Sequence, residues 1–363
     1  MTKKVKVGCC FMEKLKIGII GCGNIANCHA GGYKSCPDAE IIACCDIDRA
    51  KAEAFAKHYG IPNYYSSCDE MLAAHSFDGV SVCTWNSAHM ECTVKALESG
   101  ANVICEKPMA MNAEQAKIMK ATAEKCGRLL MIGFVRRFGN DADCVRDFIK
   151  AGALGDIYYA KATYLRRNGC PGGWFGDLRY SGGGPLIDLG VHVMDLVRYL
   201  GGSPKPVSAY GVTYNNLGFD RVHNSNKDWS VSYTKGFEYT VEDMASAMIR
   251  FDNGLTMHME ASFNLNVKRD CGIIELFGTK GGAKIDPEVE LYSDLGGHMV
   301  DIRPSNSSAL AFNGLFDKEI AHFVGCVKNG TECRSKAEDG VVLMQMIDAV
   351  YASAAGGGLV TID

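Results

Sequence analysis

The sequence predicts an α/β protein of two domains: a doubly wound parallel sheet, followed by an α+β domain with an open, mainly antiparallel sheet. The length of 363 residues suits two hydrophobic cores rather than one. The first third alternates short apolar runs with helical segments, which is typical of strand–helix–strand units. A glycine-rich turn directly follows the first run. We expect an N-terminal extension over residues 1–13, a first domain over 14–133 and a second over 134–363.

The elements of the first domain follow from its apolar pattern. Several runs are apolar throughout rather than alternating, as expected when helices cover both faces of a parallel sheet. We expect strands at Leu15–Gly21, Glu40–Asp46, Gly79–Cys83, Asn102–Cys105 and Leu129–Ile132. The segments between them have helical spacing, and we expect helices at Asn24–Tyr33, Arg49–His58, Ser87–Ser99 and Ala113–Cys126.

The pattern changes after residue 134, where the second domain begins. A Gly- and Pro-rich loop runs to Gly184, and tight turns at residues 252–254 and 278–282 separate the later strands. The C-terminal helix can pack back on the first domain. We expect helices at Asp141–Lys150, Leu186–Leu200, Asp317–Lys328 and Asp339–Ala355, and strands at Ile157–Arg166, Val207–Tyr214, Ala245–Phe251, Leu255–Phe263 and Cys271–Gly278.

Composition and charge exclude several classes of partner. Hydrophobic residues make up 47% of the chain and charged residues 22%, as in ordinary globular proteins. The 38 basic residues are outnumbered by 42 acids, whereas nucleic acid or an anionic membrane would require a basic excess. No apolar run approaches the length of a membrane span. We therefore expect neither a nucleic-acid nor a membrane partner.

The 17 cysteines do not have the pattern of a secreted protein. Disulfide scaffolds are short and use even numbers, while this number is odd and many of the cysteines lie in apolar runs. None has the C-x-x-C spacing of a zinc knuckle or a redox dithiol. We found no targeting segment and expect buried thiols in a reducing cytoplasm.

The turn after the first strand fits the dinucleotide fingerprint G-x-G-x-x-G/A. Gly21 permits the tight turn, Gly23 lets a pyrophosphate approach the backbone, and Ala26 lets the helix pack closely on the sheet. Asp46 ends the second strand, where it can bind the adenosine ribose and repel a 2′-phosphate. These features predict a Rossmann domain that binds NAD, with a tight turn lacking any ligand as the alternative. The predicted contacts are Gly21, Gly23, Asn24, Ile25, Ala26 and Asp46.

Polar residues follow the strands expected at Gly79–Cys83 and Asn102–Cys105, at the edge of the sheet where ligands bind in doubly wound folds. A lone lysine in a loop is usually solvated, but Lys107 lies between an acid and a proline just past an apolar strand. That position directs it at the cofactor crevice. We predict cofactor contacts from Thr84, Trp85, Asn86, His89, Glu106 and Lys107.

The stretch from Ser181 to His192 is the most informative part of the second domain. A run of three glycines precedes a predicted helix in which Asp188 and His192 are four residues apart on one face, with Asp195 a further turn along. Such a pair can be purely structural. The glycine run lets the helix N-terminus approach a ligand, which favours a catalytic pair. Zinc ligation is a further alternative, but no third ligand follows with recognisable spacing, and we predict no metal.

Arginine and aromatic side chains before this helix suit a polyhydroxylated ring, since aromatic faces stack on C–H groups and polar groups bind hydroxyls. The alternative is a long solvated loop. Arg136, just past the last strand of the first domain, can face the same crevice. The predicted substrate contacts are Arg136, Tyr164, Arg166, Arg167, Trp174, Asp188 and His192.

These motifs occur together, in the order found in the Gfo/Idh/MocA oxidoreductases, which the chain resembles from Lys14 nearly to its end. The resemblance rests on G-x-G-x-x-A, Asp46, Thr84-x-Asn86-x-x-His89, Glu106-Lys107-Pro108 and Gly-Gly-Gly-x-Leu-x-Asp188-x-Gly-x-His192. It implies a Rossmann domain and a second domain whose open sheet forms a homo-oligomer interface. Trp85 departs from the family, which usually has proline there, so Trp85 either stacks on a substrate ring or simply packs.

The resemblance also implies the chemistry. Lys107 matches the family's catalytic lysine, Asp188 and His192 match its Asp-x-x-x-His pair, and the Lys107–Pro108 peptide is a candidate cis bond. For oxidation of a secondary alcohol, His192 suits the general base because its ordinary pKa is about 6.5. Lys107 would stabilise the developing alkoxide, while Asp188 would bind a neighbouring hydroxyl or hold His192.

The implied substrate is a carbohydrate or cyclitol: a sugar, a glycoside oxidised at pyranoside C3, or an inositol. Two alternatives stay open, an NAD-dependent glycoside hydrolase acting by transient oxidation and a non-catalytic NAD- and sugar-sensing regulator. A regulator can dispense with the lysine and histidine. The presence of Lys107, Asp188 and His192 together therefore favours an enzyme.

Overall fold

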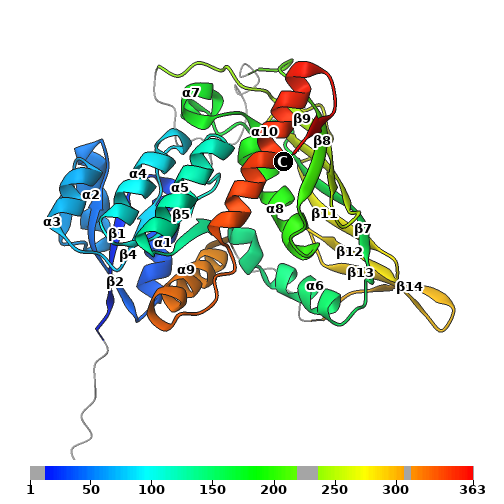
Figure 1. The fold of residues 1–363 in the computed structure, drawn as a ribbon, viewed down its shortest axis with the longest axis horizontal. Helices are drawn as coiled ribbons and strands as arrows, with labels where there is room; N and C mark the ends of the chain where they lie inside the picture. The colour runs from blue at the N-terminus through cyan, green and yellow to red at the C-terminus, as the bar shows by residue number, and fades with distance from the viewer. Residues whose placement is uncertain (1–12, 219–235, 306–311, 363) are drawn as a thin grey trace, which may run out of the picture.

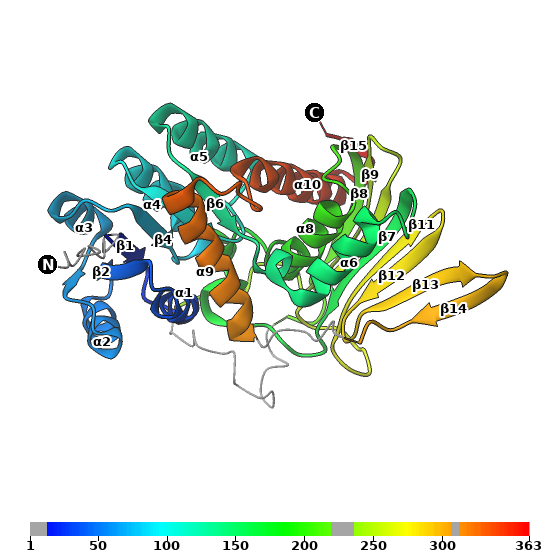
Figure 2. The same ribbon diagram turned by 90° about the horizontal axis from the view of Figure 1, so that it is seen from below.

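The computed structural model describes residues 13–218, 236–305 and 312–362, which form two domains side by side (Figure 1). The first domain holds a sheet between helices, and the second holds a larger sheet with helices on one face only (Figure 2). The expected N-terminal extension lies outside the described residues, apart from Glu13. None of the described helices is both long and apolar enough to span a membrane.

Six parallel strands build the first sheet in the doubly wound order β3-β2-β1-β4-β5-β6, which confirms the predicted Rossmann architecture. Strand β3 and helix α3 were not predicted, because β3 has only three residues, all half-buried, and forms no apolar run. The strands are β1 (Leu15–Ile20), β2 (Ala39–Cys45), β3 (Asn63–Tyr65), β4 (Gly79–Val82), β5 (Asn102–Glu106) and β6 (Leu130–Gly133).

The helices of the first domain differ in how they begin. They are α1 (Asn24–Ser35), α2 (Arg49–Tyr59), α3 (Cys68–Ala74), α4 (Asn86–Glu98) and α5 (Ala113–Cys126). Side chains of Asp48, Ser67 and Asn112 cap α2, α3 and α5 by accepting backbone N–H groups. Helix α1 begins after Gly23 with no side-chain cap. Its first N–H groups are therefore free to bind a ligand.

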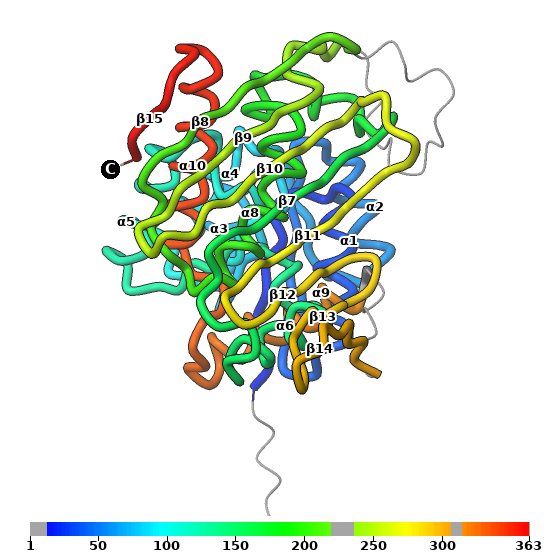
Figure 3. Tube along the Cα trace, turned by 90° about the vertical axis from the view of Figure 1, so that its right-hand side faces the viewer, coloured from blue at the N-terminus to red at the C-terminus, as the bar shows by residue number. Residues whose placement is uncertain are grey.

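The second sheet has nine strands in the order β14-β13-β12-β11-β7-β10-β9-β8-β15. Its pairs are antiparallel, as predicted, except for the parallel pair β7–β10. The strands are β7 (Ile157–Leu165), β8 (Pro206–Tyr214), β9 (Met244–Phe251), β10 (Thr256–Ser262), β11 (Cys271–Gly278), β12 (Gly281–Ile285), β13 (Glu290–Leu295), β14 (His298–Ile302) and β15 (Val360–Thr361). Figure 3 views the face of this sheet that the helices leave uncovered.

Helices cover the inner face of the second sheet and cross to the first domain (Figures 1 and 2). The loop predicted up to Gly184 contains the short helices η2 (Gly173–Gly176) and α7 (Leu178–Ser181). The remaining helices are η1 (Val135–Phe138), α6 (Asn140–Lys150), η3 (Leu186–Gly190), α8 (Val191–Leu200), α9 (Phe312–Asn329) and α10 (Ala337–Gly356).

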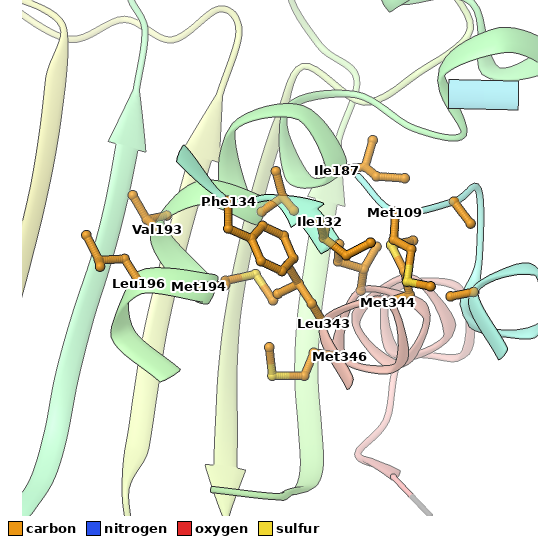
Figure 4. Close-up of a cluster of buried hydrophobic side chains, with 14 of the residues drawn as sticks. Met109, Ile132, Phe134, Ile187, Val193, Met194, Leu196, Leu343, Met344 and Met346 are labelled. Carbon is orange, nitrogen blue, oxygen red and sulfur yellow. The ribbon is translucent and has the colours of Figure 1, made fainter. Parts of the chain in front are cut away.

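The junction between the domains is a continuous apolar core. Figure 4 shows Phe134, just after β6, between Met194 of α8 and Leu343 of α10, and all three side chains are buried. Helix α9 packs on α1, and its Phe323 and Val324 join a buried cluster that includes Ile17 of the first sheet. Because both domains contribute to one core, the loops after β4 and β5 are held in a fixed position relative to α8.

Candidate active site

The loop after β5 and the turn before α8 bring Lys107 and Asp188 together. The Lys107 Nζ atom lies 2.8 Å from Asp188 Oδ1 and 3.0 Å from the Asp188 carbonyl oxygen. Both side chains are largely buried, with 16% and 11% of their surface exposed. The Lys107–Pro108 peptide is cis, as the family resemblance implied. The ammonium group of Lys107 is therefore held by two oxygens of one residue.

His192 is left without a polar partner. Among the described residues no hydrogen bond or ion pair to its side chain is found, and the residue is half-buried. Burial lowers its pKa well below the ordinary value, and the positive charges of Lys107, Arg136 and Arg166 lower it further. The imidazole is therefore neutral near pH 7 and can accept a proton.

The helix carrying Asp188 and His192 begins differently from the prediction. Residues Leu186–Gly190 form a π-helical turn, in which the Val191 N–H donates to the Leu186 carbonyl, before α8 continues as an ordinary α-helix. Single π turns inside helices often occur at functional sites. The described contacts contain no hydrogen bond between Asp188 and His192, so the expectation that Asp188 holds His192 has no contact to support it. Asp188 positions Lys107 instead.

The start of this helix is held by Glu242, which sequence reasoning missed. Its carboxylate accepts hydrogen bonds from the backbone N–H groups of Gly184 and Leu186, at 2.9 and 3.2 Å, and from the Tyr351 hydroxyl at 2.9 Å. Burial raises the pKa of Glu242, while these three donors lower it. An acid at a helix N-terminus satisfies free N–H groups and suits the helix dipole. No local pattern could have indicated it, because Glu242 is 56 residues from Leu186.

Glu106, a predicted cofactor contact, lies in a buried polar network. Its Oε1 lies 2.9 Å from His29 Nε2, and its Oε2 accepts the Lys107 backbone N–H at 3.2 Å. The other ring nitrogen of His29, Nδ1, lies 3.1 Å from the Ser81 hydroxyl oxygen. A second acid, Glu319 of α9, lies close by, and its two buried carboxylate oxygens have no hydrogen-bond partner in the part of the chain that the structure describes. Burial, followed by the neighbouring Glu106, raises the pKa of Glu319 well above its ordinary value.

The turn after β1 has the geometry of a dinucleotide cradle. Gly21 has a φ of +89°, and a Cβ there would lie 2.6 Å from the Cys83 carbonyl oxygen, so only glycine fits. A Cβ on Gly23 would meet no atom within 4 Å, which leaves open space beside the uncapped start of α1. This space fits a pyrophosphate stabilised by the helix N-terminus. Ala26 is fully buried against the sheet, whereas Asn24 is exposed and Ile25 half-buried.

Asp46 closes this cradle at the end of β2. Its carboxylate accepts the backbone N–H groups of Cys22 and Asp48, each at 2.9 Å. These bonds leave acceptor sites of a carboxylate for ribose hydroxyls. Arg49, the first basic residue after Asp46 in the sequence, packs over the Tyr64 ring at 5.4 Å. The residues present therefore fit NAD.

The residues after β4 tie the two domains together. Asn86 donates to the Ser181 carbonyl at 2.7 Å, and the His89 ring nitrogens lie 2.8 Å from Pro108 O and 3.2 Å from Thr84 O. Burial lowers the pKa of His89. Trp85 packs edge-on against the rings of Tyr180 and Phe237, with centroids 5.0 and 6.1 Å away, and Thr84 donates to the Trp85 carbonyl. Asn86 and His89 therefore support the crevice through protein contacts, while Trp85 forms part of an aromatic cluster.

The predicted substrate residues divide into two groups. The positive charges of Arg136 and Arg166 lower the pKa of His192, and the Arg166 guanidinium packs over Tyr164 at 5.4 Å. Arg167 is exposed and bonded to the loop before β11, where its backbone N–H donates to Asp270 at 2.8 Å and its side chain to Lys268 O. Trp174 stacks on Phe175, with ring centroids 3.9 Å apart. No described contact joins Arg167 or Trp174 to Lys107 or His192.

Asp195, which the helical spacing placed near the catalytic face, belongs to a different network. Its carboxylate accepts two hydrogen bonds from Arg137, at 2.6 and 2.9 Å, and both side chains are buried. Asp339 of α10 bridges Arg137 and Arg198 at 2.8 and 2.7 Å. Asp195 is therefore a structural residue that joins α8 to η1.

Fold and site together define a class of protein, the NAD-dependent oxidoreductases that carry a separate substrate domain. Two family models identify the branch within it. An oxidoreductase family with an NAD-binding Rossmann fold matches residues 15–134, and the GFO/IDH/MocA C-terminal domain matches residues 143–284. The chain belongs to the Gfo/Idh/MocA oxidoreductase family.

Individual relatives cover nearly the whole chain. D-glucoside 3-dehydrogenase of Escherichia coli (strain K12) is 34% identical over 346 residues, covering 94% of this chain and 96% of that protein. The scyllo-inositol 2-dehydrogenase (NAD(+)) of Bacillus subtilis (strain 168) is 28% identical, with coverages of 88% and 87%.

Solved structures agree with the fold. The aldose-aldose oxidoreductase from Caulobacter crescentus has a TM-score of 0.79 and 27% identity, covering 96% of this chain and 100% of that one. Levoglucosan dehydrogenase in complex with NADH has a TM-score of 0.85 at 22% identity, covering 97% and 100%. At that identity the second likeness concerns the fold alone.

Proposed function

We propose that this protein oxidises a ring hydroxyl of a carbohydrate with NAD, and that its substrate is a D-glucoside or related pyranoside oxidised at C3. The observation that carries the proposal is the half-buried His192, which has no polar partner among the described residues and whose pKa is lowered by burial and by the ammonium group of Lys107. The similarity to D-glucoside 3-dehydrogenase over nearly the whole chain supports the choice of substrate.

Each of the three residues has one task in this reaction. NAD, when bound, supplies the hydride acceptor for the carbon that bears the hydroxyl. His192 accepts the hydroxyl proton, which its lowered pKa allows near neutral pH. Lys107, held by Asp188, donates a hydrogen bond to the same oxygen and stabilises its developing negative charge. Arg136, Tyr164 and Arg166 bind neighbouring hydroxyls of the ring.

A deuterium experiment tests the position of oxidation. A β-D-glucoside deuterated at C3 and one deuterated at C2 are incubated separately with the protein and NAD. We expect deuterium in the NADH formed from the C3-labelled glucoside only, together with a 3-keto glycoside. Deuterated NADH from the C2-labelled compound would place the oxidation elsewhere on the ring.

The same assay, extended to free sugars and inositols, separates the remaining candidates. Preference for an inositol would favour a function like that of the scyllo-inositol 2-dehydrogenase. Release of the aglycone without free NADH or a keto product would indicate a hydrolase acting by transient oxidation. Binding of NAD and sugar with no product from any compound would indicate a regulator.

We also propose that the uncovered face of the second sheet joins subunits into a homo-oligomer. Tyr210 and Met248 are paired neighbours on this face, 47% and 48% exposed, and Tyr158 of β7 is exposed as well. Exposed aromatic and methionine side chains on a sheet are typical of protein interfaces. Light scattering of the wild type and of Tyr210→Glu, which should dissociate the oligomer, tests this.

Each of the 15 described cysteines is a free thiol, which supports a cytoplasmic location.

A further inference from the structure

Two thiols and an imidazole meet where α9 leads into the segment before α10. His322 and Cys326 are one turn apart on α9, and Cys333 lies on the segment between α9 and α10. One ligating atom from each lies within 4.8 Å of the other two. None of the three contacts Lys107, Asp188 or His192 through a described hydrogen bond or ion pair. The cluster is therefore separate from the candidate active site.

The spacing of these atoms suits a tetrahedral zinc centre. The Cys326 Sγ atom lies 3.4 Å from His322 Nε2. A tetrahedral ion with Zn–N bonds of about 2.0–2.1 Å and Zn–S bonds of about 2.3 Å separates two such ligand atoms by roughly 3.5 Å. The helical spacing of four residues places both side chains on one face of α9. The separation between Cys326 Sγ and His322 Nε2 therefore needs little change for an ion to bind, and Cys333 Sγ lies within 4.8 Å of both.

The unprotonated ring nitrogen of His322 is Nε2, the atom that lies in the cluster. This atom accepts the backbone N–H of Arg334 at 3.0 Å, which requires a lone pair on Nε2 and places the ring proton of the neutral imidazole on Nδ1. The ring also packs against Phe138, with centroids 5.3 Å apart. Nε2 has a single lone pair, so a metal bound there would replace the Arg334 N–H as its partner.

Burial and access also suit a divalent ion. Cys326 is 9% exposed, while Cys333 is half-buried and lines a surface hollow of about 250 Å³ together with Arg128, Lys336 and Glu338. The hollow offers a route for entry. Two thiolates and a neutral imidazole balance the charge of Zn²⁺, so the loaded site adds no net charge to a poorly hydrated region.

We propose that His322, Cys326 and Cys333 form a zinc site with one coordination position left to water. Binding replaces the two thiol protons, which pass to the solvent, with two Zn–S bonds. The ion ties the end of α9 to the segment leading into α10. That segment is also bonded to β6, where the Ile132 N–H donates to the Ser335 carbonyl at 3.0 Å. Zinc therefore stabilises the docking of α9 and α10 on the first domain.

Metal titration of the full-length protein tests this site. The reduced, chelator-treated protein is titrated with Zn²⁺ against a coloured chelator, and with Co²⁺ while its absorption spectrum is recorded. We expect one ion per chain, release of two protons, and the thiolate charge-transfer and tetrahedral ligand-field bands of cobalt. Cys333→Ser and His322→Ala should weaken zinc binding by about 100-fold or more, since loss even of an outer-shell contact costs 10–100-fold.

A matched cysteine variant completes the test. Cys36 packs against the same apolar cluster as Cys333 but lies outside the thiol–imidazole group, so Cys36→Ser should bind zinc like the wild type. Equal zinc binding by Cys333→Ser and wild type would overturn the proposal. So would cobalt spectra without thiolate bands, or a Cys326–Cys333 disulfide in protein isolated under thiol-blocking conditions that binds no zinc after reduction. The cobalt spectrum of the wild type keeps the test decisive if a variant does not fold.

Discussion

The helix from Leu186 to Leu200 carries acidic and basic side chains at both ends, and the partners of these side chains differ between the two ends. Near its start, Asp188 pairs with the partly exposed Lys107, while His192 has no polar partner among the described residues. Near its end, Asp195 and Arg198 are buried in a network with Arg137 and Asp339. The first end leaves a base free to react, whereas the second satisfies every charge.

This difference allows one helix to serve both catalysis and the domain junction. A buried ion pair adds little net stability, but removal of one partner is costly because the other charge is stranded. The paired end therefore fixes the position of the helix, and the free end presents His192 with a lowered pKa. Substitutions at the start should change turnover with little effect on folding, and substitutions at the end should do the reverse.

The largest expected effects come from Lys107→Ala and His192→Ala. Each should lose roughly 10²–10⁴-fold in turnover, as expected for the removal of a general base or an oxyanion-stabilising donor, while NAD binding is retained. Steady-state kinetics and NAD titration by tryptophan fluorescence check this. Near-normal turnover in both variants would contradict the assignment of these residues.

Arg137→Met should destabilise the fold by removing the cation from the paired end of the helix. Asp195 would be left buried without its cation, and we expect a loss of about 3–5 kcal/mol in the free energy of unfolding. Arg136→Met serves as the control, because the Arg136–Asp286 pair is more exposed and should contribute no more than about 1 kcal/mol. Urea unfolding measures both. Equal losses in the two variants would remove the distinction between the ends of the helix.

The pH dependence of turnover should report the lowered pKa of His192. Since the base must be neutral, kcat/KM should hold constant as the pH falls through the ordinary histidine range and decline only below it. Removing a nearby positive charge favours the imidazolium, so Arg136→Gln should move the acid limb to higher pH. An unchanged acid limb in this variant would show that another group controls the decline.

The smallest effect is expected for Glu319→Gln. Glu319 is a buried acid with no hydrogen-bond partner among the described residues, whereas Asp195 is paired with Arg137. The unfolded chain releases the Glu319 proton at about pH 4.3, whereas the folded protein keeps it to higher pH. Between these two pKa values the folded state binds the extra proton, and stability falls as the pH rises. The variant should unfold within about 1 kcal/mol of wild type near pH 5 and be the more stable one at alkaline pH. Urea unfolding of both proteins measures this. The same difference in the free energy of unfolding between the variant and the wild type near pH 5 and at alkaline pH would contradict it.

Much of the molecule was predictable because its signals are local. Apolar runs, helical spacing and the glycine turn after β1 predicted the parallel sheet, and the motifs around Lys107, Asp188 and His192 predicted the crevice. The short strand β3 and the π turn at Leu186–Gly190 were missed, since neither leaves a periodic pattern. The thiol–imidazole cluster was missed as well, because its spacing matches no known motif.

The sequence by itself determined the fold class, the cofactor cradle and the residue types available for catalysis, since these depend on neighbours within a turn or a strand. Only the tertiary structure decided the partners. Asp188 binds Lys107 from 81 residues away, Asp195 binds Arg137 from 58, and the charge of Arg166 rather than that of its neighbour Arg167 lowers the pKa of His192. The physical reason is that these pairings depend on which strands and helices become adjacent when the two domains share a core, and no local pattern encodes that adjacency.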